Sequence, residues 1–286
     1  MANLKEIRIR ISSVSSTMQI TSAMKMVSAA KLKKAQDAIT AMRPYSNKLS
    51  ELMQSFSGAS GGGGKSYTEN RTLKKVLAVA ISSNRGLCGA FNANIAKEAL
   101  VFKSKEKFKN SQIDFLTIGK KINDTLSKTE TIIQNDSDVF EELNYDNVGK
   151  IADELMNRFI SNDYDHIEII YNSFKNAATQ IIKSEQFLPI PLKENEGSDN
   201  LDYIFEPSLE SIANTLIPKS LKIQLFKAIR DSFASEHGAR MTAMHKATDN
   251  ASELRDELKL TYNKARQASI TNEILEIVGG AEALNN

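Results

Sequence analysis

Residues 4–18 read LKEIRIRISSVSSTM, and their apolar side chains recur at every third or fourth position. The spacing continues without a shift of frame through Leu4, Ile7, Ile11, Val14, Met18, Leu32, Ala35, Ile39, Met42, Leu49, Met53 and Phe56. Polar residues interrupt it only at Thr21, Lys25, Ser28 and Ser46. A period near 3.5 residues is typical of helices that pack along one seam. The sequence therefore predicts one long helix over residues 2–57.

The C-terminal end repeats this spacing at Phe233, Met244, Ala247, Ala251, Leu254, Leu258, Ala265, Ala268 and Leu275. About 55 helical residues span roughly 80 Å, and an unbroken helix from Ser208 would span roughly 110 Å. A compact chain of 286 residues has a radius of gyration of only about 19 Å. Both helices must therefore extend beyond a compact domain and bury their apolar stripes against each other. Because the intervening residues bring the chain back, we predict an antiparallel coiled coil whose C-terminal tip lacks a partner in this chain.

Between the two helices, short apolar runs alternate with helical patterns. We predict strands at Val76–Ile81, Ile113–Ile118, Thr131–Ile133, His166–Tyr171, Gln180–Ile190 and Leu201–Phe205. We predict helices at Ala90–Lys107, Lys120–Ser127 and Val148–Ile160. This alternation indicates a mainly parallel sheet, so the fold class is α/β, with a small Rossmann-like domain inserted into the coiled coil.

The predicted domains follow from these elements. They are an N-terminal coiled-coil helix (1–57), a linker (58–73), the α/β domain (74–206) and a C-terminal coiled-coil helix (207–286). Two prolines fall inside the helical segments. We expect Pro44 to kink or weaken the first helix, and Pro218 to interrupt the last one or to begin a new helix at its first turn.

Composition restricts the function. The net charge of +2 argues against nucleic-acid binding, although residues 1–57 carry nine Lys or Arg and only three acidic residues. That excess fits either a solvated helix face or a partner with an acidic lining. One cysteine, Cys88, excludes an internal disulfide, and no run of 18 apolar residues would span a membrane. The N-terminus continues the heptad pattern, so we interpret it as mature structure of a bacterial-type chain rather than a targeting peptide.

A glycine-rich stretch, ASGGGGKS at residues 59–66, resembles a phosphate-binding P-loop but has Ala59 where the pattern requires Gly. A P-loop follows a buried strand and opens a helix, because backbone N–H groups must converge on phosphate. Here a long helix precedes the glycines, so we favour a linker over a nucleotide site.

No other motif predicts an active site. Residues 82–89, SSNRGLCG, follow the first strand, where α/β sheets place ligand loops, yet no histidine lies nearby to activate Cys88. The three histidines, His166, His237 and His245, have no metal-ligand spacing, and no G-x-S-x-G element is present. We therefore expect no catalytic residue, cofactor or metal in this chain.

The most specific stretch runs from Ala239 to Ala281. Small and polar residues alternate around this helix, which fits either a slim coiled coil or a surface that slides past several neighbours. Its end, IVGGAEAL at residues 277–284, is apolar and nearly uncharged, so we expect it to need a hydrophobic sleeve.

These residues resemble the gamma subunit family of F-type rotary ATP synthases over essentially the whole chain. Residues 20–32, ITSAMKMVSAAKL, resemble that family's first helix, and residues 82–89 resemble its Ser-Ser-Asp-Arg-Gly-Leu-Cys-Gly loop, with Asn84 in place of Asp. The spacing of Ile270, Thr271, Glu273, Glu276, Gly280, Ala281 and Ala283 fits the family's C-terminal signature.

The resemblance implies a central shaft that couples proton-driven rotation of a membrane ring to conformational change in the catalytic beta subunits. It implies alpha, beta and epsilon subunits and the membrane c-ring as partners, at the cytoplasmic face of the bacterial inner membrane, with membrane association only indirect. By the same resemblance, Met24, Lys25, Arg240, Arg266 and Gln267 would contact the beta subunit. Tyr203 and Glu206 would lie at the foot near the membrane ring.

Two other classes of protein share some of these features. A static coiled-coil scaffold would have the helices but leaves the middle domain and the unpartnered tip unexplained. A P-loop nucleotidase would bind ATP on its own and would lose that binding without Lys65.

Overall fold

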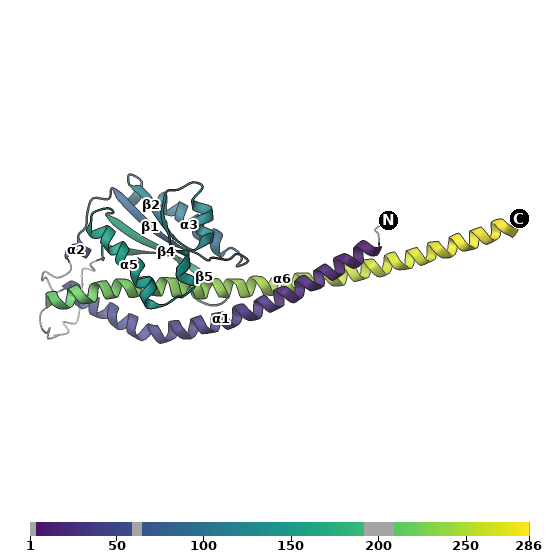
Figure 1. The fold of residues 1–286 in the computed structure, drawn as a ribbon, viewed down its shortest axis with the longest axis horizontal. Helices are drawn as coiled ribbons and strands as arrows, with labels where there is room; N and C mark the ends of the chain where they lie inside the picture. Colours follow the sequence, from purple (N-terminus) through teal and green to yellow (C-terminus); the bar gives the residue numbers. More distant parts are fainter. Residues whose placement is uncertain (1–3, 59–64, 192–208, 286) are drawn as a thin grey trace. The chain divides into compact units, whose positions relative to one another are not determined.

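The computed structural model describes residues 4–58, 65–191 and 209–285 (Figure 1). The chain forms two compact units, one of Met1–Ser28 with Met241–Asn286 and the other of Ala29–Arg240. Two long helices, α1 (Leu4–Gly58) and α6 (Leu209–Asn285), each contribute to both units.

In the first unit α1 and α6 pack side by side in opposite directions. Arg8 Nη2 lies 2.7 Å from Tyr262 Oη, Arg255 Nη1 lies 3.6 Å from Met18 Sδ, and the hydroxyls of Thr21 and Thr248 are 2.8 Å apart. Because the partner's number falls as the α1 number rises, the pair is antiparallel. This confirms the predicted coiled coil.

The seam of this pair includes polar positions as well as apolar ones. Ile7, Met244 and Ala251 are buried, and so are Thr21 and Ser28, two of the residues that interrupt the apolar series. Their hydroxyls are satisfied within the helix, since Ser28 donates to Met24 O at 2.8 Å. Small polar side chains thus continue the packing stripe without leaving unpaired groups.

The second unit contains one five-stranded sheet in the order β3-β2-β1-β4-β5. Its strands are β1 (Lys75–Ile81), β2 (Gln112–Ile118), β3 (Ile132–Asn135), β4 (His166–Phe174) and β5 (Gln180–Leu188). The pairs β1–β2, β2–β3 and β1–β4 are parallel, and β4–β5 is antiparallel. This confirms the predicted α/β fold and the hairpin at its end.

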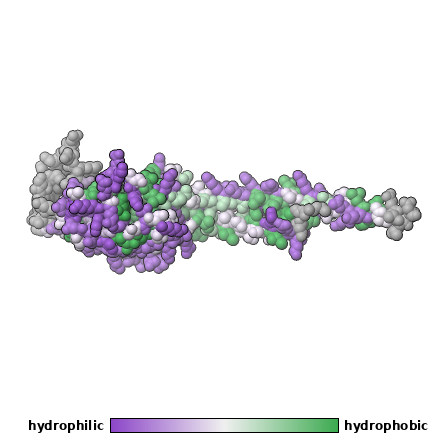
Figure 2. All heavy atoms as spheres, turned by 90° about the horizontal axis from the view of Figure 1, so that it is seen from above, coloured by the Kyte–Doolittle hydropathy of each residue, from purple (hydrophilic) through white to green (hydrophobic). Residues whose placement is uncertain are grey.

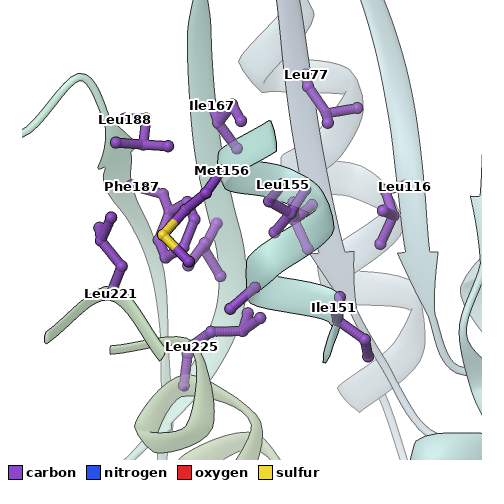
Figure 3. Packing of buried hydrophobic residues seen from close by; sticks show 14 of the residues in the cluster. Leu77, Leu116, Ile151, Leu155, Met156, Ile167, Phe187, Leu188, Leu221 and Leu225 are labelled. Carbon is purple, nitrogen blue, oxygen red and sulfur yellow. The ribbon is translucent and has the colours of Figure 1, made fainter. Parts of the chain in front are cut away.

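Alternate residues of β1 face two separate cores. Leu77, Val79 and Ile81 pack with α5 (Tyr145–Ile160) and with α6, where Leu221 and Leu225 meet Met156 and Phe187 (Figure 3). Val76, Ala78 and Ala80 pack on the other face with α3 (Phe91–Lys103) and α4 (Lys120–Leu126). A strand that is apolar on both faces is the form expected for the centre of a parallel sheet. The shorter helices are α2 (Lys65–Thr68), η1 (Glu106–Phe108) and η2 (Ser137–Phe140).

Two helix predictions differ from the structure. The prediction that Pro218 interrupts the last helix or begins a new one was wrong, because α6 continues through it. The hydrogen bond that proline cannot make would go to the carbonyl of Asn214, an exposed residue, while buried Ile217 and Leu221 hold the flanking turns in the core. The helix predicted over Ala90–Lys107 ends at Lys103 and is followed by η1, since Ser104 and Lys105 donate to Val101 O and Phe102 O. The strand predicted at Leu201–Phe205 lies outside the described residues.

Candidate functional site

The loop of residues 82–89 lies at the carboxyl end of β1 and ties three strands together. Asn84 accepts a hydrogen bond from Lys120 N (3.0 Å), after β2, and donates one to Ser137 O (2.9 Å), after β3. Ser83 N donates to Asn92 Oδ1 (3.1 Å) at the start of α3. The amide of Asn84 therefore fills the position at which an α/β sheet often binds a ligand.

The tip of this loop has an unusual backbone. Leu87 has a φ of 60°, although it is not glycine, and its side chain is 64% exposed. A left-handed leucine is costly and persists only where surrounding contacts impose it.

Those contacts come from Arg240 of α6. Its Nη2 donates to Arg85 O (2.9 Å) and Gly86 O (3.1 Å), and its Nη1 lies 2.7 Å from Glu236 Oε1. Arg240 and Glu236 are both more than nine-tenths buried. Burial raises the pKa of Glu236, and the Arg240 guanidinium opposes that rise.

Neutral His237 completes this cluster. Burial, together with the positive charges of Arg240 and Lys31, lowers the pKa of His237 to about 3. Its Nδ1 faces Arg240 Nη1 at 3.4 Å, and its Nε2 has no hydrogen-bond partner among the residues that the structure describes.

Cys88 lacks the features of a catalytic thiol. Its side chain is 2% exposed, and burial raises the pKa of the thiol. The neighbours of its sulfur are the Asn92 amide (3.2 Å), Ser83 Oγ (3.9 Å) and Arg85 O (3.9 Å). A buried, protonated thiol of this kind is inert.

Residues assigned to partner contacts by resemblance occupy different environments. Met24 and Lys25 are half-buried on α1, and Arg266 and Gln267 are exposed on α6. Beyond them every described residue from 271 to 281 is exposed, and Ile277 reaches 71% (Figure 2 gives the hydropathy of the surface). Arg240, in contrast, is bonded inside its own unit. Tyr203 and Glu206 lie outside the described residues.

The two motifs weighed for nucleotide and metal chemistry lack the required context. Among the described elements, helix α1 precedes the glycine run and the four-residue helix α2 follows it. The glycine run is therefore not preceded by a described strand, as a P-loop would be. Across residues 4–58, 65–191 and 209–285, no three His, Cys, Asp or Glu side chains gather as metal ligands. His166 pairs with Glu168 at 2.7 Å, and His245 lies 3.3 Å from Asp249.

Comparison with known proteins shows the family. A family model described as ATP synthase matches residues 3–284. The ATP synthase gamma chain of Flavobacterium psychrophilum is 68% identical over 286 residues, covering 99% of each chain. The chain belongs to the ATP synthase gamma chain family. The gamma chain of Flavobacterium johnsoniae is 67% identical over the full length of both chains.

Solved structures carry the same fold. A chain of the Euglena gracilis mitochondrial ATP synthase has a TM-score of 0.69 at 21% identity, covering 98% of this chain and 94% of that one. A chain of the central stalk and c-ring structure of the Tetrahymena thermophila enzyme has a TM-score of 0.57 at 26% identity, covering 80% of this chain and 99% of that one. The Euglena gracilis chain therefore shares the fold of this chain over nearly its whole length.

Sequence reasoning did not find the buried cluster around Arg240. The sequence feature that could have indicated the cluster is SEHGAR at residues 235–240. There Glu236 and Arg240 are four residues apart on a helix, with Gly238 between them. That spacing also describes an ordinary exposed ion pair.

Proposed function

We propose that this member of the gamma chain family is the central rotor shaft of a proton-translocating ATP synthase and is not itself catalytic. The observation that carries the proposal is the antiparallel pair of α1 and α6, from which the C-terminal end of α6 extends with its apolar residues exposed. An exposed apolar helix end is unfavourable in water and calls for a surrounding partner. A ring of alternating alpha and beta subunits supplies such a sleeve.

The proposed partners are the alpha and beta subunits, the epsilon subunit and the membrane c-ring. We assign Met24, Lys25, Arg266 and Gln267 to contacts with the beta subunit. Arg240 is buried and donates to Arg85 O, so we propose that it acts indirectly. It would hold the 82–89 loop in place, and the loop would contact a partner. We assign Tyr203 and Glu206 to the foot near the membrane ring, and we retain the domain division at residues 57, 73 and 206.

Rotation would act on the beta subunits through differential affinity. A shaft that bound every beta conformation equally well would shift none of them, whatever its total affinity. Exposed polar groups such as Arg266 and Gln267 suit this role, because their contacts in water form and break at little cost.

The proposed location is the cytoplasmic face of a bacterial inner membrane, with attachment only through other subunits and no contact with nucleic acid. None of the described helices combines the length and the apolar content that crossing a bilayer requires.

Reconstitution tests the proposal. The chain is mixed with purified alpha and beta subunits, and assembly and ATP hydrolysis are followed, with the chain alone as the control. We expect one copy to join a hexamer and activity to appear only in the assembly. ATP hydrolysis by the chain alone would favour the nucleotidase, and indifference to both subunits would favour the static scaffold.

A further inference from the structure

Side chains of α6 bind the main chain of the α/β domain at several points within the second unit. Four of them donate to backbone carbonyl oxygens: Gln224 to Gln186 O (3.1 Å), Arg230 to Leu143 O (2.9 Å), Ser235 to Asn172 O (3.0 Å) and Arg240 to Arg85 O (2.9 Å). The acceptors belong to β5, to the segment before α5, to β4 and to the loop after β1. We call α6 residues 224–240, with these acceptors, the carbonyl clamp.

The donors leave the helix in different directions. At about 100° per residue, Gln224 and Ser235 share one side of α6, whereas Arg230 and Arg240 each leave from another. Bonds on one side would let the helix roll about that line of contact. Bonds on three sides oppose both rolling and sliding along the axis.

Carbonyl acceptors also make the attachment stiff. A side-chain acceptor can follow a moving donor by changing rotamer, but a carbonyl fixed in a strand or a tied loop cannot. Asn172 O belongs to β4 at a position paired with Ile182 of β5, and Arg85 O belongs to the loop anchored by Asn84 and Ser83.

A close backbone approach accompanies these bonds. Gly238 of α6 faces the turn between β4 and β5, and a Cβ at this position would lie 3.1 Å from Ala177 O. Glycine inside a helix lowers the stability of the helix by about 1 kcal/mol relative to alanine. Gly238 thus weakens α6 slightly but lets it lie close to the backbone of the domain.

We propose that the carbonyl clamp locks α6 to the α/β domain against rotation, so that torque applied to the domain passes into the helix without slip. Ser235 and Arg240 are its main positioning residues, because they bind at β4 and at the β1 loop from different sides of the helix. The proposal rests on the proposed function, in which α6 is part of a turning shaft.

Two serines on the same helix provide a matched test. Ser235 and Ser232 are both buried, but Ser232 Oγ has no hydrogen-bond partner among the described residues. Ser235→Ala removes a clamp bond, whereas Ser232→Ala removes an equal hydroxyl and no bond. Arg240→Lys is a third variant, which keeps the charge beside Glu236 but loses the forked contact with the loop carbonyls.

The first readout is hydrogen exchange in the full chain. Leaving Asn172 O without its donor costs about 1–3 kcal/mol, which corresponds to about 5- to 150-fold faster exchange of the β4 amides around it. We expect that acceleration in Ser235→Ala and none in Ser232→Ala. Equal exchange in the two variants would overturn the clamp.

The second readout is rotation in the complex reconstituted with alpha and beta subunits. A bead is attached to the α/β domain through Lys109→Cys, an exposed site, while Cys88 is too buried to compete for the label. In stalled complexes we expect a wider angular distribution for Ser235→Ala and Arg240→Lys than for the parent and Ser232→Ala.

The outcomes separate the two proposals. If the parent complex rotates and all variants have the same angular distribution as the parent, the clamp is overturned and the rotor function stands. A parent that assembles but never rotates refutes the rotor function, and with it any role of the clamp in torque.

Discussion

The hydroxyls of Thr21 and Thr248 form a part-buried polar contact across the helical seam of the first unit. The two oxygens are 2.8 Å apart, and Thr21 is 8% exposed. We predict that replacing either threonine with valine destabilises the pair only slightly, and that replacing both is close to neutral.

The expected loss of stability follows from the number of hydroxyl protons available for hydrogen bonds. Thr21 Oγ1 lies 3.1 Å from Met18 O, and Thr248 Oγ1 lies 2.8 Å from Met244 O. Two hydroxyl protons thus serve three possible bonds, and losing one hydroxyl leaves the other still donating to its own helix. Since no buried donor is stranded, each single change should cost at most about 0.5–1 kcal/mol, and the double change should cost less than the sum of the two.

A double-mutant cycle checks this reasoning. Hydrogen exchange of α1 amides in the parent, Thr21→Val, Thr248→Val and the double variant reports the free energy of opening this seam. Thr17→Val is the control, because its hydroxyl donates only to Ser13 O on an exposed face. A single variant that lost more than about 2 kcal/mol, well above the net value of one hydrogen bond, would refute the proton count and make the cross-helix bond a main support.

Three further predictions concern the loop, the histidine and the partner contacts. Asn84→Asp should destabilise the second unit by about 1–3 kcal/mol, because a carboxylate would face Ser137 O where the amide now donates. Urea unfolding at pH 7 should show this loss, with Asn110→Asp on an exposed turn as the control. The folded pKa of His237, about 3, lies below its ordinary 6.5, so the stability that it contributes is complete above pH 6.5 and is lost as pH falls toward 3. Between pH 6.5 and 5 the parent should therefore lose about 2 kcal/mol more than His237→Gln, and parallel stability curves would contradict this assignment. In the reconstituted complex, Arg266→Ala should lower the rate of ATP hydrolysis up to about fivefold, the effect of about 1 kcal/mol expected for an exposed charged contact, whereas Lys264→Ala, also exposed on α6, should not.

The helices and the central strands were predictable because their patterns are local. The register of α1 follows from its apolar spacing, and the buried Thr21 and Ser28 keep that register although they are polar. β1 was predictable because a short run that is apolar on both faces and is bounded by Ser82, Ser83 and Asn84 fits the centre of a parallel sheet.

The buried cluster was not predictable for a physical reason. Spacing along a helix gives the direction in which Arg240 leaves it, but not which main-chain carbonyls another part of the chain brings to that side. Pro218 shows the same limit, because tertiary packing around Ile217 and Leu221 outweighs the local cost of proline.

The carbonyl clamp constrains the sequence of α6 more than that of the α/β domain. Its acceptors are main-chain carbonyl oxygens, which every amino acid supplies, so Arg85, Leu143, Asn172 and Gln186 can change side chain without removing the acceptor. Its donors are particular side chains of α6, and most replacements there abolish a bond. Mutational drift should therefore be tolerated on the sheet side of this contact and resisted on the helix side. A saturation library should be depleted more strongly at Ser235 than at Ser232, which is also buried but has no hydrogen-bond partner among the described residues.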